Sequence, residues 1–168
     1  ESFNVPMIIR YPGKIRPHVD TTLFSSVDIM PTLLSMAGLS DDVPSTAEGL
    51  DLSKHLMETN RDCPGPSSVI YIRNLDGERD ADGMVSGFFP QARGIKTATH
   101  TMEISIKRDG KLERVLIFND CNDPYQMHPI DPQDNPQLFE SLLTELSAKL
   151  EEADDIWYRN EIISNLKF

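Results

Sequence analysis

The chain has 168 residues, of which 27 are acidic and 16 are basic, so its formal net charge is −11. A chain of this length can bury a hydrophobic core and form a domain of ordinary size. The acidic excess argues against nucleic acid as a partner, because phosphate binding depends on clustered Lys and Arg. No apolar run approaches the length that spans a bilayer, so we expect no membrane partner either.

The first predicted element is a strand in the short apolar run from Val5 to Arg10. This run is nearly continuous, and the turn residues Tyr11-Pro12-Gly13 close it. An apolar run of this kind is typical of a buried strand that ends in a turn.

A helix is predicted to follow at residues 29–37. Asp28 is its expected N-cap, and Pro31 lies in the first turn, where its missing N–H group costs no intrahelical hydrogen bond. Gly38 suits the left-handed conformation with which many helices end. The next stretch, residues 39–66, is predicted to be mostly loop, with one helical turn at 52–57.

The second half of the chain predicts an antiparallel sheet. The expected strands are residues 68–73, 92–98, 99–107 and 112–118, with a hairpin turn at 108–111. In the third of these strands, polar and apolar side chains alternate, which places them on opposite faces. Its polar face carries Thr101, Glu103 and Ser105, and its apolar face carries Met102, Ile104 and Ile106.

A long amphipathic helix is expected to cover the apolar face of this sheet. Asn135 can cap it and Pro136 takes its first position. Over residues 136–152, apolar side chains recur at helical spacing: Leu138, Phe139, Leu142, Leu143, Leu146 and Leu150. Burial of such side chains contributes about 1.5–3 kcal/mol each before entropy is counted. The predicted fold class is therefore α+β, and the tail from Trp157 to Phe168 is predicted to be a terminal helix or an arm.

Five segments of the sequence carry a resemblance to a known family. They read VPMIIRYPG at residues 5–13, SVDIMPTLLSMAG at 26–38, EGLDL at 48–52, RGIKT at 93–97 and LIFNDCNDPYQ at 116–126. In this order they resemble the C-terminal portion of the formylglycine-dependent (type I) sulfatases, the arylsulfatase family within the alkaline-phosphatase-like superfamily. The resemblance reaches across most of the chain, apart from residues 58–91 and about the last fifteen.

This resemblance implies two domains. Residues 1–57 would be the end of an α/β catalytic domain, a remnant made of the strand and the helix. Residues 58–168 would be an antiparallel-sheet sub-domain packed against the helix at 136–152. The intact parent would hydrolyse sulfate esters, with a sulfated carbohydrate as the expected substrate, and would be exported to the periplasm, the extracellular space or the lysosome.

The resemblance also implies a formylglycine nucleophile and a calcium ion in the parent, and we identify residues for neither in this chain. The nucleophile arises from Cys or Ser within C/S-x-P/A-x-R, but Cys63 is followed by Gly65 and Ser67 where that pattern requires Pro or Ala, and Arg. Calcium needs six or more converging oxygens. The acidic pairs Asp41-Asp42 and Asp154-Asp155 lack flanking carboxylates and are interpreted as solvated surface charge. We therefore expect the chain alone to have no sulfatase activity.

The candidate substrate-binding residues are Arg93 and His100. The family's sub-domain contributes strand-connecting loops to the rim of the substrate cleft, and the long segment 74–91 would be either such a loop or a surface insertion. Arg93 can present a planar guanidinium to sulfate, or it can form a salt bridge at a strand edge. His100 begins a strand and can point toward a substrate, whereas a single histidine is often structural.

Two hypotheses from other functional classes remain open. One is a non-catalytic module that binds sugar or another protein. The other is a fragment of a related phosphoryl-transfer enzyme, because that superfamily shares the fold. The order of the DxxPTLLxxAG-like segment and the RxIRT-like strand favours the sulfatase.

Several further residues have weaker interpretations. His18 is expected to be exposed, and spacing suggests no partner for His55 or His128. Cys63 and Cys121 can pair only in an oxidising compartment. Because a strand removed from a large sheet leaves unpaired edges and apolar surface, residues 1–40 are expected to mediate self-association.

Overall fold

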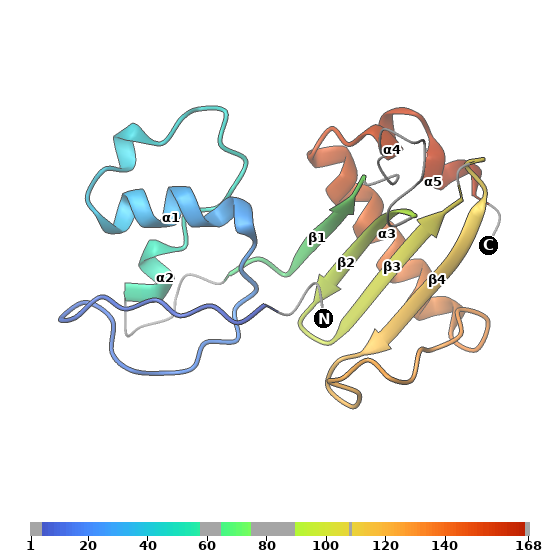
Figure 1. Ribbon diagram of the computed structural model, residues 1–168, viewed down its shortest axis with the longest axis horizontal. Helices are drawn as coiled ribbons and strands as arrows, with labels where there is room; N and C mark the ends of the chain where they lie inside the picture. The colour runs from blue at the N-terminus through green and yellow to red at the C-terminus, as the bar shows by residue number, and fades with distance from the viewer. Residues whose placement is uncertain (1–4, 58–64, 75–89, 108, 167–168) are drawn as a thin grey trace, which may run out of the picture. The chain divides into compact units, whose positions relative to one another are not determined.

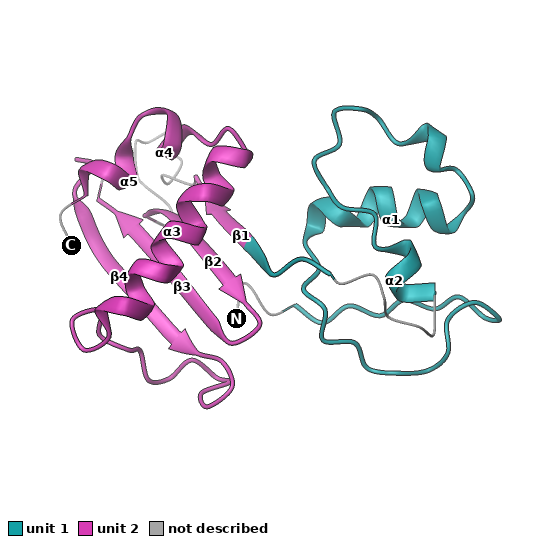
Figure 2. Ribbon diagram, turned by 180° about the vertical axis from the view of Figure 1, so that it is seen from behind, with its two compact units in different colours: residues 1–69 teal, residues 70–168 magenta. Residues whose placement is uncertain are grey.

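The computed structural model describes residues 5–57, 65–74, 90–107 and 109–166 (Figure 1). The chain divides into two compact units, Glu1–Val69 and Ile70–Phe168 (Figure 2). The predicted domain border between residues 57 and 58 lies where a stretch outside the described residues begins, and it stays a prediction.

Unit 1 consists of short helical elements joined by loops. Its elements are the 3-10 turn η1 (Ser26–Asp28), α1 (Ile29–Met36), the 3-10 turn η2 (Ser40–Asp42) and α2 (Ser53–Met57). The strand that we predicted at Val5–Arg10 does not form: the described residues of this segment pair with no neighbouring strand. A strand needs a partner backbone, and among the described residues unit 1 supplies none before β1.

Asp28 and Thr32 fasten the segment at residues 49–52 to α1. Asp28 is buried, and its carboxylate accepts hydrogen bonds from the N–H groups of Ser25 (2.7 Å) and Leu50 (2.8 Å). Asp28 takes the N-cap position of α1, as predicted, but its side chain forms no capping hydrogen bond, because both oxygens bind backbone groups outside that helix. The Thr32 hydroxyl accepts from the Leu52 N–H group (3.0 Å). A Cβ atom at Gly49 would overlap the carbonyl oxygen of Val27, so this approach requires glycine.

Unit 2 is built on a four-stranded antiparallel sheet with strand order β1-β2-β3-β4 (Figure 1). The strands are β1 (Ser68–Arg73), β2 (Gln91–Thr97), β3 (His100–Ile106) and β4 (Leu112–Asn119). Each lies within one or two residues of its predicted bounds. Ile95 of β2 pairs with Met102 of β3, and Met102 pairs with Ile117 of β4, so the apolar positions share one face.

Helix α3 (Pro136–Glu152) covers that face of the sheet, as predicted (Figure 2). The Asn135 side chain caps it by accepting a hydrogen bond from the Leu138 N–H group (3.2 Å). Two short helices follow, α4 (Ile156–Arg159) and α5 (Ile162–Asn165). The buried core consists of Ile95, Met102, Ile104, Ile106, Ile117, Phe139, Leu142, Leu146, Leu150 and Trp157. The α+β prediction is confirmed.

The region after α3 contributes to this core instead of projecting as an arm. Trp157 of α4 is completely buried, and Ile162 and Ile163 of α5 pack against the core. Asp155 caps α4 by accepting a hydrogen bond from the Trp157 N–H group (2.8 Å). Within the described part of the chain, no helix is both long enough and apolar enough to cross a membrane.

Candidate functional site

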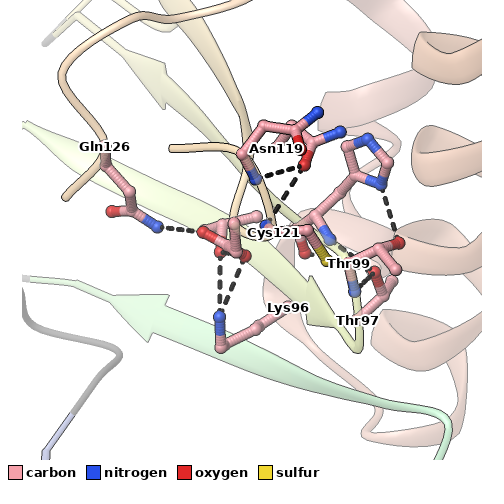
Figure 3. A network of polar contacts seen from close by, with 10 residues as sticks. Lys96, Thr97, Thr99, Asn119, Cys121 and Gln126 are labelled. Carbon is pink, nitrogen blue, oxygen red and sulfur yellow. Dashed lines mark hydrogen bonds and ion pairs between the residues drawn. The ribbon is translucent and has the colours of Figure 1, made fainter. Parts of the chain in front are cut away.

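Polar side chains gather where β2 ends, β3 begins and β4 ends (Figure 3). Antiparallel pairing brings these positions together, because the register joins Lys96 to Thr101 and His100 to Asn119. We call this group the strand-end cluster; its members are Lys96, Thr97, Thr99, His100, Thr101, Asn119, Asp120 and Gln126.

Asp120 is the central acceptor of the strand-end cluster. One carboxylate oxygen accepts hydrogen bonds from Lys96 Nζ (2.9 Å) and Thr101 Oγ1 (2.6 Å), and the other accepts from Gln126 Nε2 (2.8 Å) (Figure 3). Burial alone would raise the pKa of Asp120, but the hydrogen bonds from Thr101, Gln126 and Lys96 lower it below its usual value. The carboxylate is therefore ionised, and its hydrogen bonds tie β2, β3 and the turn after β4 together.

Thr97 closes the turn between β2 and β3. Its hydroxyl oxygen accepts hydrogen bonds from the N–H groups of His100 (3.0 Å) and Thr99 (3.3 Å), and the hydroxyl donates to the His100 carbonyl (3.2 Å). The Asp120 N–H group donates to the Thr99 carbonyl (2.9 Å) from the other side. The backbone of the turn is thus held by β2 and by the end of β4.

His100, one of the two predicted substrate-binding residues, belongs to this cluster. Its imidazole Nδ1 lies 2.8 Å from the Thr99 hydroxyl, and the residue is partly exposed. Among the described residues, none forms a hydrogen bond with Nε2. The Asn119 side-chain oxygen accepts hydrogen bonds from the N–H groups of Cys121 (3.1 Å) and Asn122 (3.0 Å), which fixes the neighbouring turn (Figure 3). The cluster therefore offers an imidazole on a rigid turn, an arrangement that can bind a polar ligand.

Arg93, the other predicted residue, occupies a different environment. It is completely buried on the core face of β2, where its Nε donates to an Asp155 carboxylate oxygen (2.9 Å). Its Nη1 donates to the carbonyl of Ala92 (2.9 Å), and its guanidinium lies 4.9 Å from the centre of the Trp157 ring. The geometry therefore favours the salt-bridge interpretation over contact with a substrate.

The pairing of Arg93 with Asp155 corrects one prediction. We interpreted Asp154-Asp155 as a solvated acidic pair, and only Asp154 is exposed. Asp155 is buried together with Arg93, and the two form an ion pair. A buried charge is stable only when an opposite charge compensates it. The structure also separates the two candidates: Arg93 pairs with Ile104 within the sheet, whereas His100 pairs with Asn119 at its end.

Unit 1 contains a second polar cluster, which the sequence did not predict. His55 of α2 is buried, and its Nε2 lies 3.1 Å from an Asp20 carboxylate oxygen and 2.7 Å from the Thr22 hydroxyl. The Nε2 atom of His18 lies 3.4 Å from the same Asp20 oxygen. Residues 20 and 55 are far apart in sequence, so spacing gives no sign of this contact.

The environment of Asp20 favours its ionised form. Burial by itself would raise the pKa of this carboxyl group. Hydrogen bonds from the backbone and hydroxyl of Thr22 and from the His55 and His18 imidazoles outweigh that effect and hold the pKa far below its ordinary range. Asp20 therefore ties the loop to α2 as an anion.

Several sequence predictions fall outside the described residues or concern metal binding. Residues 75–89 of the long 74–91 segment lie outside them, as does Cys63, whereas Cys121 is an exposed free thiol. Across the described ranges, no group of three or more His, Cys, Asp or Glu side chains is placed to hold a metal ion. These residues do not fit a calcium site.

The fold and sequence of the chain define it as a sulfatase C-terminal domain. Residues 1–155 match the family described as N-sulphoglucosamine sulphohydrolase, C-terminal, and the chain belongs to this family. An endo-4-O-sulfatase from Bacteroides thetaiotaomicron is 43% identical over 166 residues, which cover 98% of this chain and 33% of that protein. An ulvan-active sulfatase from Formosa agariphila is 30% identical over 156 residues, covering 89% of this chain and 26% of its own length.

Solved structures show the same relationship. A Bacteroides thetaiotaomicron structure described with the metabolism of multiple glycosaminoglycans has a TM-score of 0.81 at 42% identity and covers 93% of this chain and 32% of that one. A structure in complex with D-glucosamine-2-N,6-O-disulfate has a TM-score of 0.59 at 20% identity and shows only that the fold is shared. The chain thus spans about a third or less of the length of its relatives.

Proposed function

We propose that this chain is the C-terminal part of a sulfatase that hydrolyses sulfate esters of a carbohydrate. The observation that carries this proposal is the 43% identity to an endo-4-O-sulfatase, which extends over 98% of the chain. Similarity over that extent includes both units, so the chain corresponds to one continuous third of such an enzyme. We also propose that the parent is exported.

The chemical step is assigned to the remainder of the parent. Formylglycine would supply the nucleophile, and calcium would neutralise charge on the sulfate group there. Among the described residues of this chain, no group of three or more His, Cys, Asp or Glu side chains could hold that ion. The chain by itself is accordingly expected to show no turnover of an aryl sulfate.

This chain would contribute to substrate choice through the strand-end cluster. The His100 imidazole stands partly exposed on a fixed turn, with Nδ1 engaged by Thr99. It can therefore donate or accept a hydrogen bond through Nε2 toward a saccharide group. Arg93 would act indirectly, because its buried guanidinium supports β2 from the core.

The test compares two substrates in the full-length sulfatase that contains this chain. His100→Ala and His100→Gln are assayed on a sulfated saccharide and on a small aryl sulfate, which lacks the saccharide groups that His100 would contact. Loss of one hydrogen bond to an ionised or polar partner should lower kcat/KM for the saccharide by roughly ten- to a hundredfold. The aryl sulfate reaction should keep its rate.

A matched control is available in the same unit. His128 is an exposed histidine in the turn after β4, and His128→Ala should leave both reactions unchanged. Equal losses on both substrates with His100→Ala would show an effect on folding or chemistry. No loss on either substrate would remove His100 from the proposed contact.

A further inference from the structure

The turn between β2 and β3 lacks the residues that usually make such a turn. Only Ala98 and Thr99 separate the two strands. Two-residue hairpin loops depend on Gly, Asn or Asp because one or both of their residues adopt a positive φ. Neither Ala98 nor Thr99 is among the described residues with a positive φ. Something other than glycine must therefore hold this turn in shape.

The side chain of Thr97 supplies that support. The Thr97 side chain forms three hydrogen bonds with described residues. All three join it to backbone groups of Thr99 and His100. A threonine hydroxyl that binds nearby backbone groups can replace the backbone bonding of a regular turn. The Thr97 hydroxyl therefore holds the His100 main chain on the side of β2, in addition to the pairing of His100 with Asn119 of β4.

The same hydroxyl also controls the orientation of the imidazole. His100 Nδ1 contacts the hydroxyl of Thr99 at 2.8 Å, and the main chains of both residues are held by Thr97. From the other side, the Asp120 N–H group holds the Thr99 carbonyl at 2.9 Å. The two residues of the imidazole contact are thus held by the same groups, and no described residue forms a hydrogen bond with Nε2.

We infer that Thr97 is a positioning residue, which fixes the Thr99–His100 turn so that the His100 imidazole meets the substrate in one orientation. This inference rests on the proposed function of His100. It adds a residue that touches no substrate and that acts only through the imidazole. Small displacements of a binding group are costly because recognition depends on preset geometry.

The experiment uses the full-length sulfatase with Thr97→Val, which keeps the branched shape and removes the hydroxyl, and Thr97→Ser, which keeps the hydroxyl. Thr97→Val should raise KM for the sulfated saccharide and lower kcat/KM by about two- to tenfold, with kcat little changed. Thr97→Ser should stay close to the parent enzyme. Neither variant should alter hydrolysis of a small aryl sulfate.

The double variant separates positioning from general stability. In a His100→Ala background, Thr97→Val should cause no further loss on the saccharide, because the group that it positions is gone. A full additional loss in that background, or equal losses on both substrates, would overturn the inference. So would a Thr97→Val enzyme with unchanged saccharide kinetics while His100→Ala is impaired, a result that leaves the proposed function intact.

The remaining outcomes are also decisive. If His100→Ala has no effect on the saccharide, the proposed substrate contact of His100 fails and the positioning role fails with it. If Thr97→Val does not fold, Thr99→Val provides the second test, because Thr99 is exposed and its hydroxyl is the contact through which the fixed turn holds the His100 imidazole. The expected result is the same selective loss on the saccharide, and its absence would overturn the inference.

Discussion

The two units of the chain bury apolar side chains to very different extents. In unit 2, ten core side chains from three strands and two helices form one cluster. In the described part of unit 1, the buried apolar side chains are Pro31, Met36 and Leu52, whereas Ile8 and Val19 are 93% and 88% exposed. Unit 1 is held instead by buried polar contacts, such as those of Asp28 and Thr32.

This difference teaches what each unit needs in order to be stable. Hydrophobic burial is the main favourable contribution to folding, and unit 2 obtains it within its own residues. The exposed apolar side chains of unit 1 are of the kind that a partner surface covers. The expected self-association through residues 1–40 stays a prediction, and the exposure of Ile8 and Val19 is its physical basis.

The largest expected effect comes from breaking the buried ion pair of unit 2. Asp155→Ala leaves the Arg93 guanidinium buried without a carboxylate, which should cost about 3–5 kcal/mol in the free energy of unfolding. Trp157 lies beside the pair, so its fluorescence during denaturation in urea reports the loss. Asp154→Asn is the matched control because that neighbouring carboxylate is exposed and asparagine tolerates the positive φ (47°) of this position, so it should change stability by less than about 0.5 kcal/mol.

Comparable losses for Asp154→Asn and Asp155→Ala would contradict this account of unit 2. Replacing both partners, Arg93→Met with Asp155→Leu, should recover much of the stability, because an apolar pair leaves no charge unpaired. A double variant as unstable as Asp155→Ala would show that the charges themselves are needed.

A slightly smaller effect is expected from leucine truncation, and it contrasts the two units directly. Leu146 of α3 is completely buried and Leu33 of α1 is 46% exposed. Leu146→Ala should cost about 2–5 kcal/mol, because a cavity remains in the core. Leu33→Ala should cost less than about 1 kcal/mol in the chain by itself. Urea denaturation of both variants checks the contrast, and similar losses would mean that unit 1 buries Leu33 in solution.

The smallest expected effect concerns acid and unit 1. The pKa of Asp20 is far lower in the folded chain than its unfolded value of about 3.9. Its stabilising contribution is therefore complete above that unfolded value and is lost as the pH falls below it toward the folded pKa. The protection of the Thr22 amide against hydrogen exchange should decrease over this range, because that N–H group donates to Asp20 (2.9 Å).

Asp20→Asn should remove most of this pH dependence, since the amide does not titrate. Asp41→Asn, at an exposed position of the same unit, should leave it in place. An unchanged pH profile in Asp20→Asn would show that another group controls the acid response.

The sequence predicted the parts of the fold that depend on local periodicity. Alternation in β3 and helical spacing in α3 identified both elements and the faces that they bury, and Asn135 marked where α3 begins. The prediction of a strand at Val5–Arg10 was wrong. A strand also requires a neighbouring strand with which to pair, and periodicity does not reveal whether one is present.

The site was less predictable because its contacts are non-local. His100 was identified by its place at the start of a strand, but the hydroxyl of Thr97 and the carboxylate of Asp120 became visible only with the register of β2, β3 and β4. Arg93 was identified by its charge. The residues beside it in the sequence give no sign of its ion pair with Asp155, which lies 62 residues further along the chain.

The burial of Trp157 shows that the folded unit extends past the match to the family model. That match covers residues 1–155, yet the indole two residues later is completely buried. A polypeptide cut at the limit of the family match would lose that side chain and the stacking surface of the Arg93 guanidinium. The folded unit therefore includes α5, whose Ile162 and Ile163 pack against the core beyond the residues that the family model covers.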